Sequence, residues 1–221
     1  MVYDKYYFEG KGSNYRPYED KLAVIRKKYL PKIIRIGLKR NSSVLDIGCA
    51  FGYFLRCCDE IGYTTWGVDI STYAITRARE ETVAKLCVSD VNNGLPFFED
   101  NSFDLVTMFD VIEHLQKPCT VLNEAHRILK ASGILIVTTP NLNAIERLFK
   151  KSMGQESAWH GFHDHTHLCV FTTRYLKRLV EQTGFHVKLE TIFHPLPRLF
   201  QHLANRTGLG GQIWLTAIKS S

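Results

Sequence analysis

The segment Val44–Leu55, with the sequence VLDIGCAFGYFL, combines an acidic residue with a row of small ones. Asp46 follows an apolar run, and Gly48, Ala50 and Gly52 occupy alternate positions before a helix-like stretch. Small residues at the start of a helix let a ligand approach backbone N–H groups. The spacing is not the G-x-G-x-x-G of a nicotinamide-binding loop. Because a carboxylate ahead of the first glycine would repel a pyrophosphate, we expect a ligand with a cationic amino group and no phosphate.

Two more acidic residues stand where later strand-like runs end. Asp69 closes the run TTWGVD, about 20 residues after the glycine-rich loop, where a carboxylate can accept both hydroxyls of a ribose. Asp90 closes the run AKLCVSD, where it can accept a hydrogen bond from an adenine amino group. A lone aspartate at a strand end is usually a turn or helix cap. The ordered series of Asp46, Asp69 and Asp90 instead indicates a site for an adenosine-containing ligand.

Strand-like and helix-like segments alternate along the chain and position these residues. The expected strands are 43–48, 64–69, 84–90, 103–109, 133–139, 186–193 and 212–219. The expected helices are 53–61, 72–81, 118–129 and 172–184. This alternation predicts an α/β fold with a doubly wound parallel sheet, whose ligands bind beyond the carboxyl ends of the strands. The last two strands, joined by a short polar stretch, are expected to pair antiparallel.

In this order and spacing, the motifs resemble those of the class I S-adenosylmethionine-dependent methyltransferases, in particular members that act on small molecules. The resemblance covers roughly Val44 to Phe185 and rests on the loop DIGCAFG, on Asp69 and Asp90, and on the run that ends MFDVIEHL. The family's loop usually reads D-x-G-x-G-x-G, and Ala50 replaces its middle glycine. The segments YDKYYFEG and FTTRYLKRLVEQTGF are also similar to members of this family.

The resemblance implies a fold and a set of cofactor-binding residues. The fold is a seven-stranded, mostly parallel sheet of order 3-2-1-4-5-7-6, with the last strand antiparallel and helices on both faces. In it, Asp69 would bind the ribose and Asp90 the adenine end of S-adenosylmethionine, while Asp46 and Gly48 would face the methionine portion. The residues predicted to bind the cofactor are Asp46, Gly48, Cys49, Gly52, Asp69, Ile70, Asp90, Val91, Phe109 and Asp110.

His114 is the candidate catalytic residue. A sulfonium carries its own leaving group, so the protein has only to align the acceptor about 3 Å from the methyl group and, where needed, to remove its proton. His114 follows the fourth strand at the mouth of the site, where it can act as that base or simply pack and cap the next turn. Asp104 begins the same strand at the opposite edge and is expected to be structural. Phe97, Phe98 and Phe103 are expected to be core residues.

The segment 141–170, between the fifth strand and the next helix, is expected to form a lid over the acceptor. Its large apolar residues can enclose an apolar or aromatic acceptor, or pack the lid down; they are Phe149, Met153, Trp159 and Phe162. Its imidazoles suit an acceptor with hydroxyl groups; they are His163, His165 and His167. We therefore predict O-methylation of a small metabolite, with N- and C-methylation left open.

Composition fits one domain, residues 1–221, with a helical segment at 1–40. No apolar run reaches the roughly 18 residues of a membrane span, and the N-terminus lacks the pattern of a secretory signal. The six cysteines form no C-x-x-C pair, which favours reduced thiols in the cytoplasm. The net charge of +6 permits an anionic partner. The basic segment Lys21–Arg40, in which Pro31 is expected to divide the helix into two pieces, is interpreted as a solvated surface helix.

Alternative functions remain open at this point. The basic segment could follow the phosphates of an RNA that is methylated on its 2′-hydroxyl, although a nucleic acid is the less favoured partner. The protein could also bind S-adenosylmethionine without transferring its methyl group, as a monomer or a homodimer. A third alternative concerns Asp110, Glu113, His114 and His167. Their pattern is similar to the divalent-metal site of small-RNA 2′-O-methyltransferases and some quinone-pathway O-methyltransferases, but the predicted site contains no metal.

Overall fold

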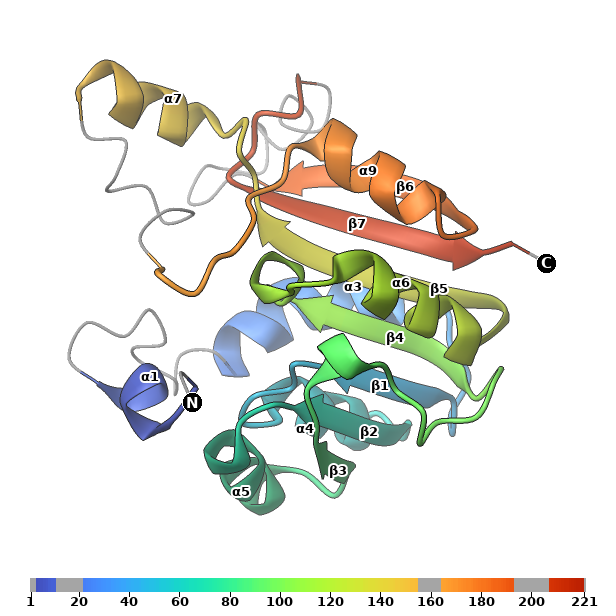
Figure 1. The fold of residues 1–221 in the computed structure, drawn as a ribbon. Coiled ribbons are helices and arrows are strands. Elements are labelled where there is room, and N and C mark those ends of the chain that lie inside the picture. Colours follow the sequence, from blue (N-terminus) through green and yellow to red (C-terminus); the bar gives the residue numbers. More distant parts are fainter. Residues whose placement is uncertain (1–2, 11–21, 155–163, 193–206, 221) are drawn as a thin grey trace.

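A seven-stranded sheet forms the centre of the protein (Figure 1). The computed structural model describes residues 3–10, 22–154, 164–192 and 207–220. The strand order is β3-β2-β1-β4-β5-β7-β6, and β7 runs in the direction opposite to the other six strands, antiparallel to both β5 and β6. The strands are β1 (Ser43–Ile47), β2 (Thr64–Asp69), β3 (Lys85–Val88), β4 (Phe103–Phe109), β5 (Leu129–Pro140), β6 (Phe185–Ile192) and β7 (Gln212–Lys219). The predicted order and the antiparallel last strand are confirmed.

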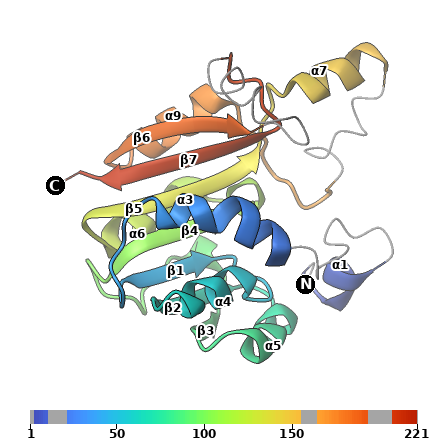
Figure 2. The same ribbon diagram turned by 180° about the vertical axis from the view of Figure 1, so that it is seen from behind.

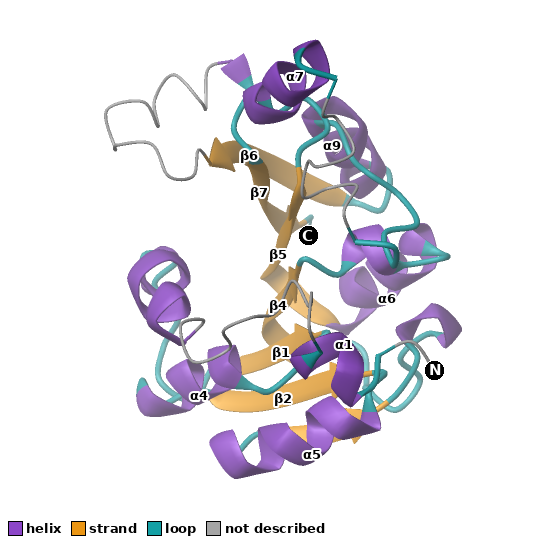
Figure 3. Ribbon diagram, turned by 90° about the vertical axis from the view of Figure 1, so that its left-hand side faces the viewer, coloured by secondary structure: helices purple, strands orange, loops and turns teal. Residues whose placement is uncertain are grey.

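Helices cover both faces of the sheet, as Figures 2 and 3 show from two directions. One face carries α3 (Leu30–Ile34), α4 (Tyr53–Glu60) and α5 (Thr72–Glu81), whose apolar side chains share a core cluster with β1. The other face carries α6 (Pro118–Ile128) and α9 (Thr173–Glu181), which pack in a second cluster with β4 and β5. β1 and β4 lie between the two helical layers, and eight of their twelve residues are apolar, as expected for strands covered on both faces.

Three short helices and one longer one lie toward the edge of the sheet at which the parallel strands end. They are α1 (Lys5–Glu9), η2 (Val91–Asn93), η3 (Ile112–His114) and α7 (Ile145–Ser152). In Figure 1, α1 and α7 both lie on the left, the side toward which the arrow of β5 points. The protein thus places the elements that follow β3, β4 and β5, together with its first helix, around one edge.

The expected strand and helix boundaries agree closely with the structure, with a few corrections. β5 begins at Leu129 rather than residue 133, and its pairing with β4 shifts register between Phe103 and Leu105. β3 ends at Val88, so Asp90 lies in the loop beyond it. The connection between β6 and β7 runs from residue 193 to residue 211 and is not the short stretch that was expected.

Pro31 does not interrupt the first long helix. The chain stays helical from Leu22 to Ile34, and the change it makes is from a π-helical turn, η1 (Ile25–Tyr29), to α-helix at α3. Pro31 lacks the N–H that would donate to the preceding turn, and that turn is the irregular, π-helical one. The two predicted pieces are therefore two helix types in one continuous segment. Among the described residues, no helix combines the length and apolarity required to traverse a bilayer.

Candidate cofactor and acceptor site

A cavity of about 650 Å³ lies beyond the carboxyl ends of β1, β2 and β4. Figure 3 looks onto this edge of the sheet. Every residue predicted to bind the cofactor lines the cavity except Gly52, and His114 lines it too. The cavity therefore brings together residues from Asp46 to His114, which belong to four stretches of the chain. Other residues, to which no sequence motif pointed, also line the cavity.

Asp46 is a buried carboxylate at the end of β1. Its side chain accepts a hydrogen bond of 2.6 Å from the hydroxyl of Thr107 on β4. Burial raises the pKa of Asp46 to about 7, with the nearby charge of Asp69 adding to the rise and the hydrogen bond from Thr107 opposing it. A cationic group placed beside this carboxyl would restore its ionised form.

The glycine-rich loop turns with left-handed backbone angles at Gly48, Ala50 and Gly52, whose φ values are 73°, 47° and 75°. Its N–H groups are already used: those of Gly48 and Cys49 donate to the carbonyl of Val68, at 2.7 and 3.1 Å, and that of Gly52 donates to Cys49. The N–H of Ala50 donates to Asp69, as described next. The expectation that this loop offers its N–H groups to the ligand is therefore wrong for these four residues.

Glycine is required in this loop for steric reasons. A Cβ atom at Gly48 would lie 2.3 Å from Cγ2 of Val111, a residue that lines the cavity. At Gly52, a Cβ would lie 2.9 Å from Cγ2 of Thr82. Gly52 begins α4 and allows it to pack closely on the end of α5, so its position in the structure is structural rather than in the cavity. The group that closely approaches Gly48 is therefore the side chain of Val111, whereas the sequence analysis expected a ligand there.

Asp69 joins the end of β2 to the glycine-rich loop. One carboxyl oxygen accepts a hydrogen bond of 2.9 Å from the N–H of Ala50, and the other accepts one of 2.8 Å from Ser71. Burial raises the pKa of Asp69, while these backbone donors oppose the rise. A carboxylate has about four acceptor positions, and backbone N–H groups of Ala50, Ser71 and Ile70 compete for them. The rest of its acceptor capacity faces the cavity that Asp69 lines.

Asp90 and the residues beside it form the next part of the cavity wall. Asp90 caps η2: one oxygen accepts hydrogen bonds from the backbone and the side-chain amide of Asn92, at 3.0 and 2.9 Å. Ile70 and Val91 line the cavity on either side of the two acidic loops. Asp90 thus caps a helix, as a lone aspartate at a strand end usually does, and it also lines the cavity.

Asp110 is held in an unusual backbone conformation at the end of β4, with φ of 54°. Its carboxyl accepts hydrogen bonds of 3.0 Å from the hydroxyl of Thr138 and from the side-chain amide of Gln212. Phe109 packs against Tyr29, with ring centroids 4.9 Å apart. Gln212 and Tyr29 also line the cavity, and no motif pointed to either. Both reach the site only through the antiparallel β7 and the first long helix.

Three residues of the N-terminal segment close the cavity from outside the sheet; they are Tyr3, Tyr7 and Phe8. Phe8 is buried against Phe51 of the glycine-rich loop, with centroids 5.1 Å apart. The ring of Tyr3 lies edge-on to His114 at 6.1 Å. The segment YDKYYFEG was singled out only for its similarity to the family, and the structure gives it a place at the site.

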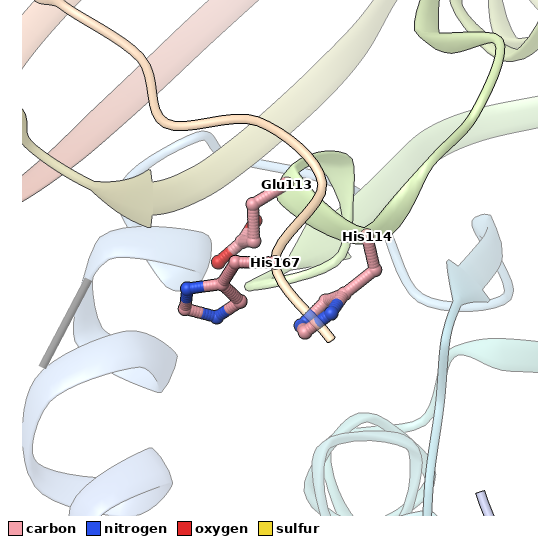
Figure 4. A group of neighbouring side chains, drawn as sticks. All are labelled: Glu113, His114 and His167. Carbon is pink, nitrogen blue, oxygen red and sulfur yellow. The ribbon is translucent and has the colours of Figure 1, made fainter. Parts of the chain in front are cut away.

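Glu113, His114 and His167 form a cluster on the acceptor side (Figure 4), in which one ligand atom from each lies within 4.8 Å of the others. Neither carboxyl oxygen of Glu113 has a hydrogen-bond partner among the residues that the structure describes. Burial, reinforced by the charge of Asp110, raises the pKa of Glu113 well above its usual value. Burial and the neighbouring His167 lower the pKa of His114. Asp110, the fourth residue of the metal pattern, turns instead to Thr138 and Gln212.

The residues expected to belong to the lid lie in different environments. Met153, at the end of α7, has 55% of its surface exposed and does not line the cavity, so the expectation that it encloses the acceptor is wrong. His165 is exposed, whereas His167 reaches the cavity. The following lie outside the described residues: the side chain of Phe149, and Trp159, Phe162 and His163.

Two expectations concern residues away from the site. Asp104 accepts hydrogen bonds from the N–H of Ser43 and from the ammonium of Lys130, at 2.7 and 2.8 Å, and ties three strands together. Its structural role is confirmed. Phe103 is buried in the core, but Phe97 is 47% exposed and is not a core residue.

Comparison with known proteins agrees with this geometry. The model of the methyltransferase domain family matches residues 19–190. A probable S-adenosylmethionine-dependent methyltransferase of Mycolicibacterium smegmatis is 30% identical over 151 residues, covering 66% of this chain and 52% of that protein. A ubiquinone biosynthesis O-methyltransferase of Pseudomonas aeruginosa is 28% identical over 145 residues, covering 62% and 59%.

The chain spans about half the length of the curated relatives that it matches. Among solved structures, a SAM-dependent methyltransferase from Archaeoglobus fulgidus has a TM-score of 0.68 at 23% identity and covers 97% of both chains. The strand order and the family match together establish the relationship. The chain belongs to the methyltransferase domain family, with the fold of the class I S-adenosylmethionine-dependent methyltransferases.

Proposed function

We propose that this protein is an S-adenosylmethionine-dependent methyltransferase that methylates an oxygen of a small metabolite. The observation that carries the proposal is a single cavity whose lining includes both the acidic residues Asp46, Asp69 and Asp90 and the pair Glu113 and His114. Three carboxylates in this order suit a ligand with an amino group, a ribose and an adenine. The remaining groups then face the end of the ligand that carries the methyl group.

The part of the cavity lined by Asp46, Asp69 and Asp90 is called here the cofactor half, and each of these acidic residues has a distinct role in it. The remaining acceptor positions of Asp69 receive the two ribose hydroxyls, and Asp90 receives the adenine amino group. Asp46 lies where the cationic amino group of the methionine portion would ionise it. Ile70, Val91 and Phe109 supply apolar contacts along the same wall. The residues fit the cofactor chemically, because the cavity offers acceptors for its donors.

The part of the cavity lined by Asp110, Glu113, His114, Asp164 and His167 is called here the acceptor half. In it, His114 removes the proton of the acceptor hydroxyl. S-adenosylmethionine, held by Asp46, Asp69 and Asp90, would supply the methyl group on a sulfonium that carries its own leaving group, and would remain as S-adenosylhomocysteine. The proton of the hydroxyl passes to His114. A lowered pKa keeps the imidazole neutral near pH 7, the form that a general base requires. Segment 141–170 would then act as a lid, to which His167 belongs.

A small acceptor is supported over RNA by the charges near the cavity. Two cations of the basic segment are paired within the protein: Arg26 contacts Glu60 at 2.7 Å and Lys32 contacts Glu190 at 3.2 Å. The acceptor half itself carries the acidic residues Asp110, Glu113 and Asp164, which would repel phosphates. All six cysteines are free thiols, which supports a reducing compartment such as the cytoplasm.

The experiment that tests the proposal is incubation with methyl-labelled S-adenosylmethionine and fractionated extract of the source cell. The expected result is one labelled small metabolite whose new methyl group is bound to oxygen. Label recovered in RNA would replace the proposed acceptor. Tight cofactor binding without label in any fraction would favour a protein that binds the cofactor without transfer.

A second candidate is transfer assisted by a divalent cation. The observation in its favour is the buried carboxyl of Glu113, with two orphaned oxygens beside the imidazoles of His114 and His167. One carboxylate and two imidazoles suit Zn²⁺ or Mn²⁺, and such an ion lowers the pKa of a bound hydroxyl. Full activity in a chelator would exclude this candidate. A loss that one added metal restores, and that His167→Ala abolishes, would support it.

A further inference from the structure

The contacts of His114 determine which of its ring nitrogens carries hydrogen. Nδ1 lies 3.1 Å from the carbonyl oxygen of Thr166 and 2.9 Å from the hydroxyl oxygen of the same residue. A carbonyl oxygen accepts hydrogen bonds and cannot donate them, so this contact is a hydrogen bond only when Nδ1 carries a hydrogen. In the neutral ring, the lone pair is then on Nε2, at the side of the ring away from Thr166.

Asp164 determines the direction of the hydrogen bonds around Thr166. One oxygen of Asp164 lies 2.8 Å from the N–H of Thr166 and 2.5 Å from its hydroxyl oxygen. An ionised carboxylate only accepts, and the pKa of Asp164 is below its usual value, even though burial opposes this, because Thr166 donates to it and His167 and His114 lie near. The hydroxyl of Thr166 therefore donates to Asp164 and accepts from Nδ1–H of His114. Without the carboxylate, the same hydroxyl could rotate and donate to Nδ1, which favours the opposite tautomer.

This arrangement joins three segments that are far apart in the sequence. The backbone carbonyl of Glu113, next to His114, accepts hydrogen bonds from the N–H groups of Leu168 and Cys169, at 2.8 and 3.1 Å. Residues 164–169 are thereby fixed to η3. From the N-terminal helix, the hydroxyl of Tyr7 donates to the second oxygen of Asp164 at 3.4 Å. Asp164 thus contacts both the lid segment and α1.

We propose that Asp164 is a positioning residue which, acting through Thr166, holds His114 in the tautomer with hydrogen on Nδ1 and a lone pair on Nε2. This tautomer is the one that can take a proton from an acceptor, or bind a cation, through Nε2. The inference deepens the proposed function and rests on it for what His114 does with that nitrogen. The tautomer itself follows from the hydrogen bonds alone.

Nitrogen-15 NMR of the imidazoles, recorded with S-adenosylhomocysteine bound, tests the inference directly. The bare and the protonated ring nitrogens have well separated resonances, and His114→Gln identifies those of His114 among the nine histidines. The wild type is expected to carry hydrogen on Nδ1. Asp164→Ala is expected to populate the other tautomer, whereas Thr166→Ser, which keeps the hydroxyl, is expected to retain the wild-type one. A wild type with hydrogen on Nε2, or an Asp164→Ala spectrum identical to the wild type, overturns the proposal.

Two further measurements separate this inference from the proposed function. Affinity for S-adenosylhomocysteine should stay within about twofold in Asp164→Ala, since Asp164 is outside the cofactor half. With the acceptor found by labelling, kcat should fall about 10-fold to 100-fold, as is typical when a group that orients a histidine is removed. Absence of methyl transfer by the wild type would contradict the proposed function while leaving the tautomer result intact. Wild-type kcat in Asp164→Ala would contradict the positioning role alone.

Discussion

A carboxyl oxygen of Asp69 lies 2.9 Å from the backbone nitrogen of Ala50. This hydrogen bond fixes the end of β2 to the left-handed turn that follows β1. The same carboxylate therefore shapes the glycine-rich loop and, through its remaining acceptor positions, faces the cavity. Removing it should affect the ligand through both routes.

Asp69→Ala is expected to weaken binding of S-adenosylmethionine. The loss of one or two hydrogen bonds at about 1–3 kcal/mol each corresponds to an increase in Kd of roughly fivefold or more. Isothermal titration calorimetry measures it. Asp104→Ala is the matched control, because Asp104 also belongs to a strand but bonds Ser43 and Lys130 at the opposite edge of the sheet. Equal affinity of Asp69→Ala and the wild type would remove Asp69 from the ribose site.

Gly48→Ala is expected to abolish cofactor binding, because the added Cβ would meet Val111 in the wall of the cavity. Adding Val111→Ala should restore part of the affinity by removing the atom that the Cβ would meet. Calorimetry on the single and the double variant compares the two. If Gly48→Ala binds normally, the close approach does not control the ligand.

Gly37→Ala separates backbone strain from this steric contact. Gly37 has a similar φ of 79°, but a Cβ there would have nothing within 4 Å. Its substitution should therefore cost only the strain of a left-handed residue, about 1 kcal/mol of unfolding free energy, and leave cofactor binding intact. A similar loss of binding in both variants would show that strain, and not the contact with Val111, is responsible.

The fold and the cofactor half could be predicted because their signals are local. A buried strand followed by Asp46 and small residues, and acids at the ends of the next two strands, need only the sheet order to bring them to one edge. The N–H groups of Gly48, Cys49 and Ala50 were misjudged because their acceptors are in β2, which sequence spacing does not reveal. Gly52 was wrongly predicted to line the cavity. Its actual neighbour is Thr82, a contact that depends on how α4 packs against α5 and that the sequence does not show.

The acceptor half could be predicted only in part. His114 and His167 were identified as candidates, but Thr166 and Asp164 carry no pattern that marks them as partners of a histidine. Gln212 reaches Asp110 because β7 inserts beside β5, a pairing between strands that are far apart in sequence. Tyr3 depends on how the N-terminal segment folds back over the cavity. Side chains supplied by such long-range contacts leave no local signal.

The affinity for S-adenosylmethionine is expected to depend on pH through Asp46. In the protein without ligand, burial raises the pKa of this carboxyl to about 7, so it is protonated below that pH and ionised above it. The cationic amino group of the ligand favours the ionised form, and binding therefore lowers this pKa. Affinity should fall as pH decreases below about 7, by at most roughly tenfold per pH unit, and level off above it.

Asp46→Asn tests the assignment, since an amide does not titrate in this range. Its affinity should be lower than that of the wild type above pH 7 and nearly independent of pH from 5 to 8. The Asp69→Ala variant keeps Asp46 and should retain the slope. A slope that survives in Asp46→Asn would assign the titration to another group.

The last prediction distinguishes a small acceptor from a nucleic acid. Contacts with phosphates release bound counterions, so binding of RNA weakens steeply as salt increases. Acidic, apolar and aromatic side chains make up most of the cavity lining, with Lys28 as the one lysine among the described lining residues, and Arg26 and Lys32 of the basic helix are engaged with Glu60 and Glu190. For a small uncharged acceptor, kcat/KM should change by less than about twofold between low and physiological ionic strength, because screening acts on interactions between charges. Initial rates with the acceptor found by labelling, measured at several concentrations of potassium chloride, provide the test. A fall in kcat/KM of tenfold or more would favour RNA as the substrate. In that case the double variant Lys27→Glu, Lys28→Glu would be expected to abolish binding of RNA.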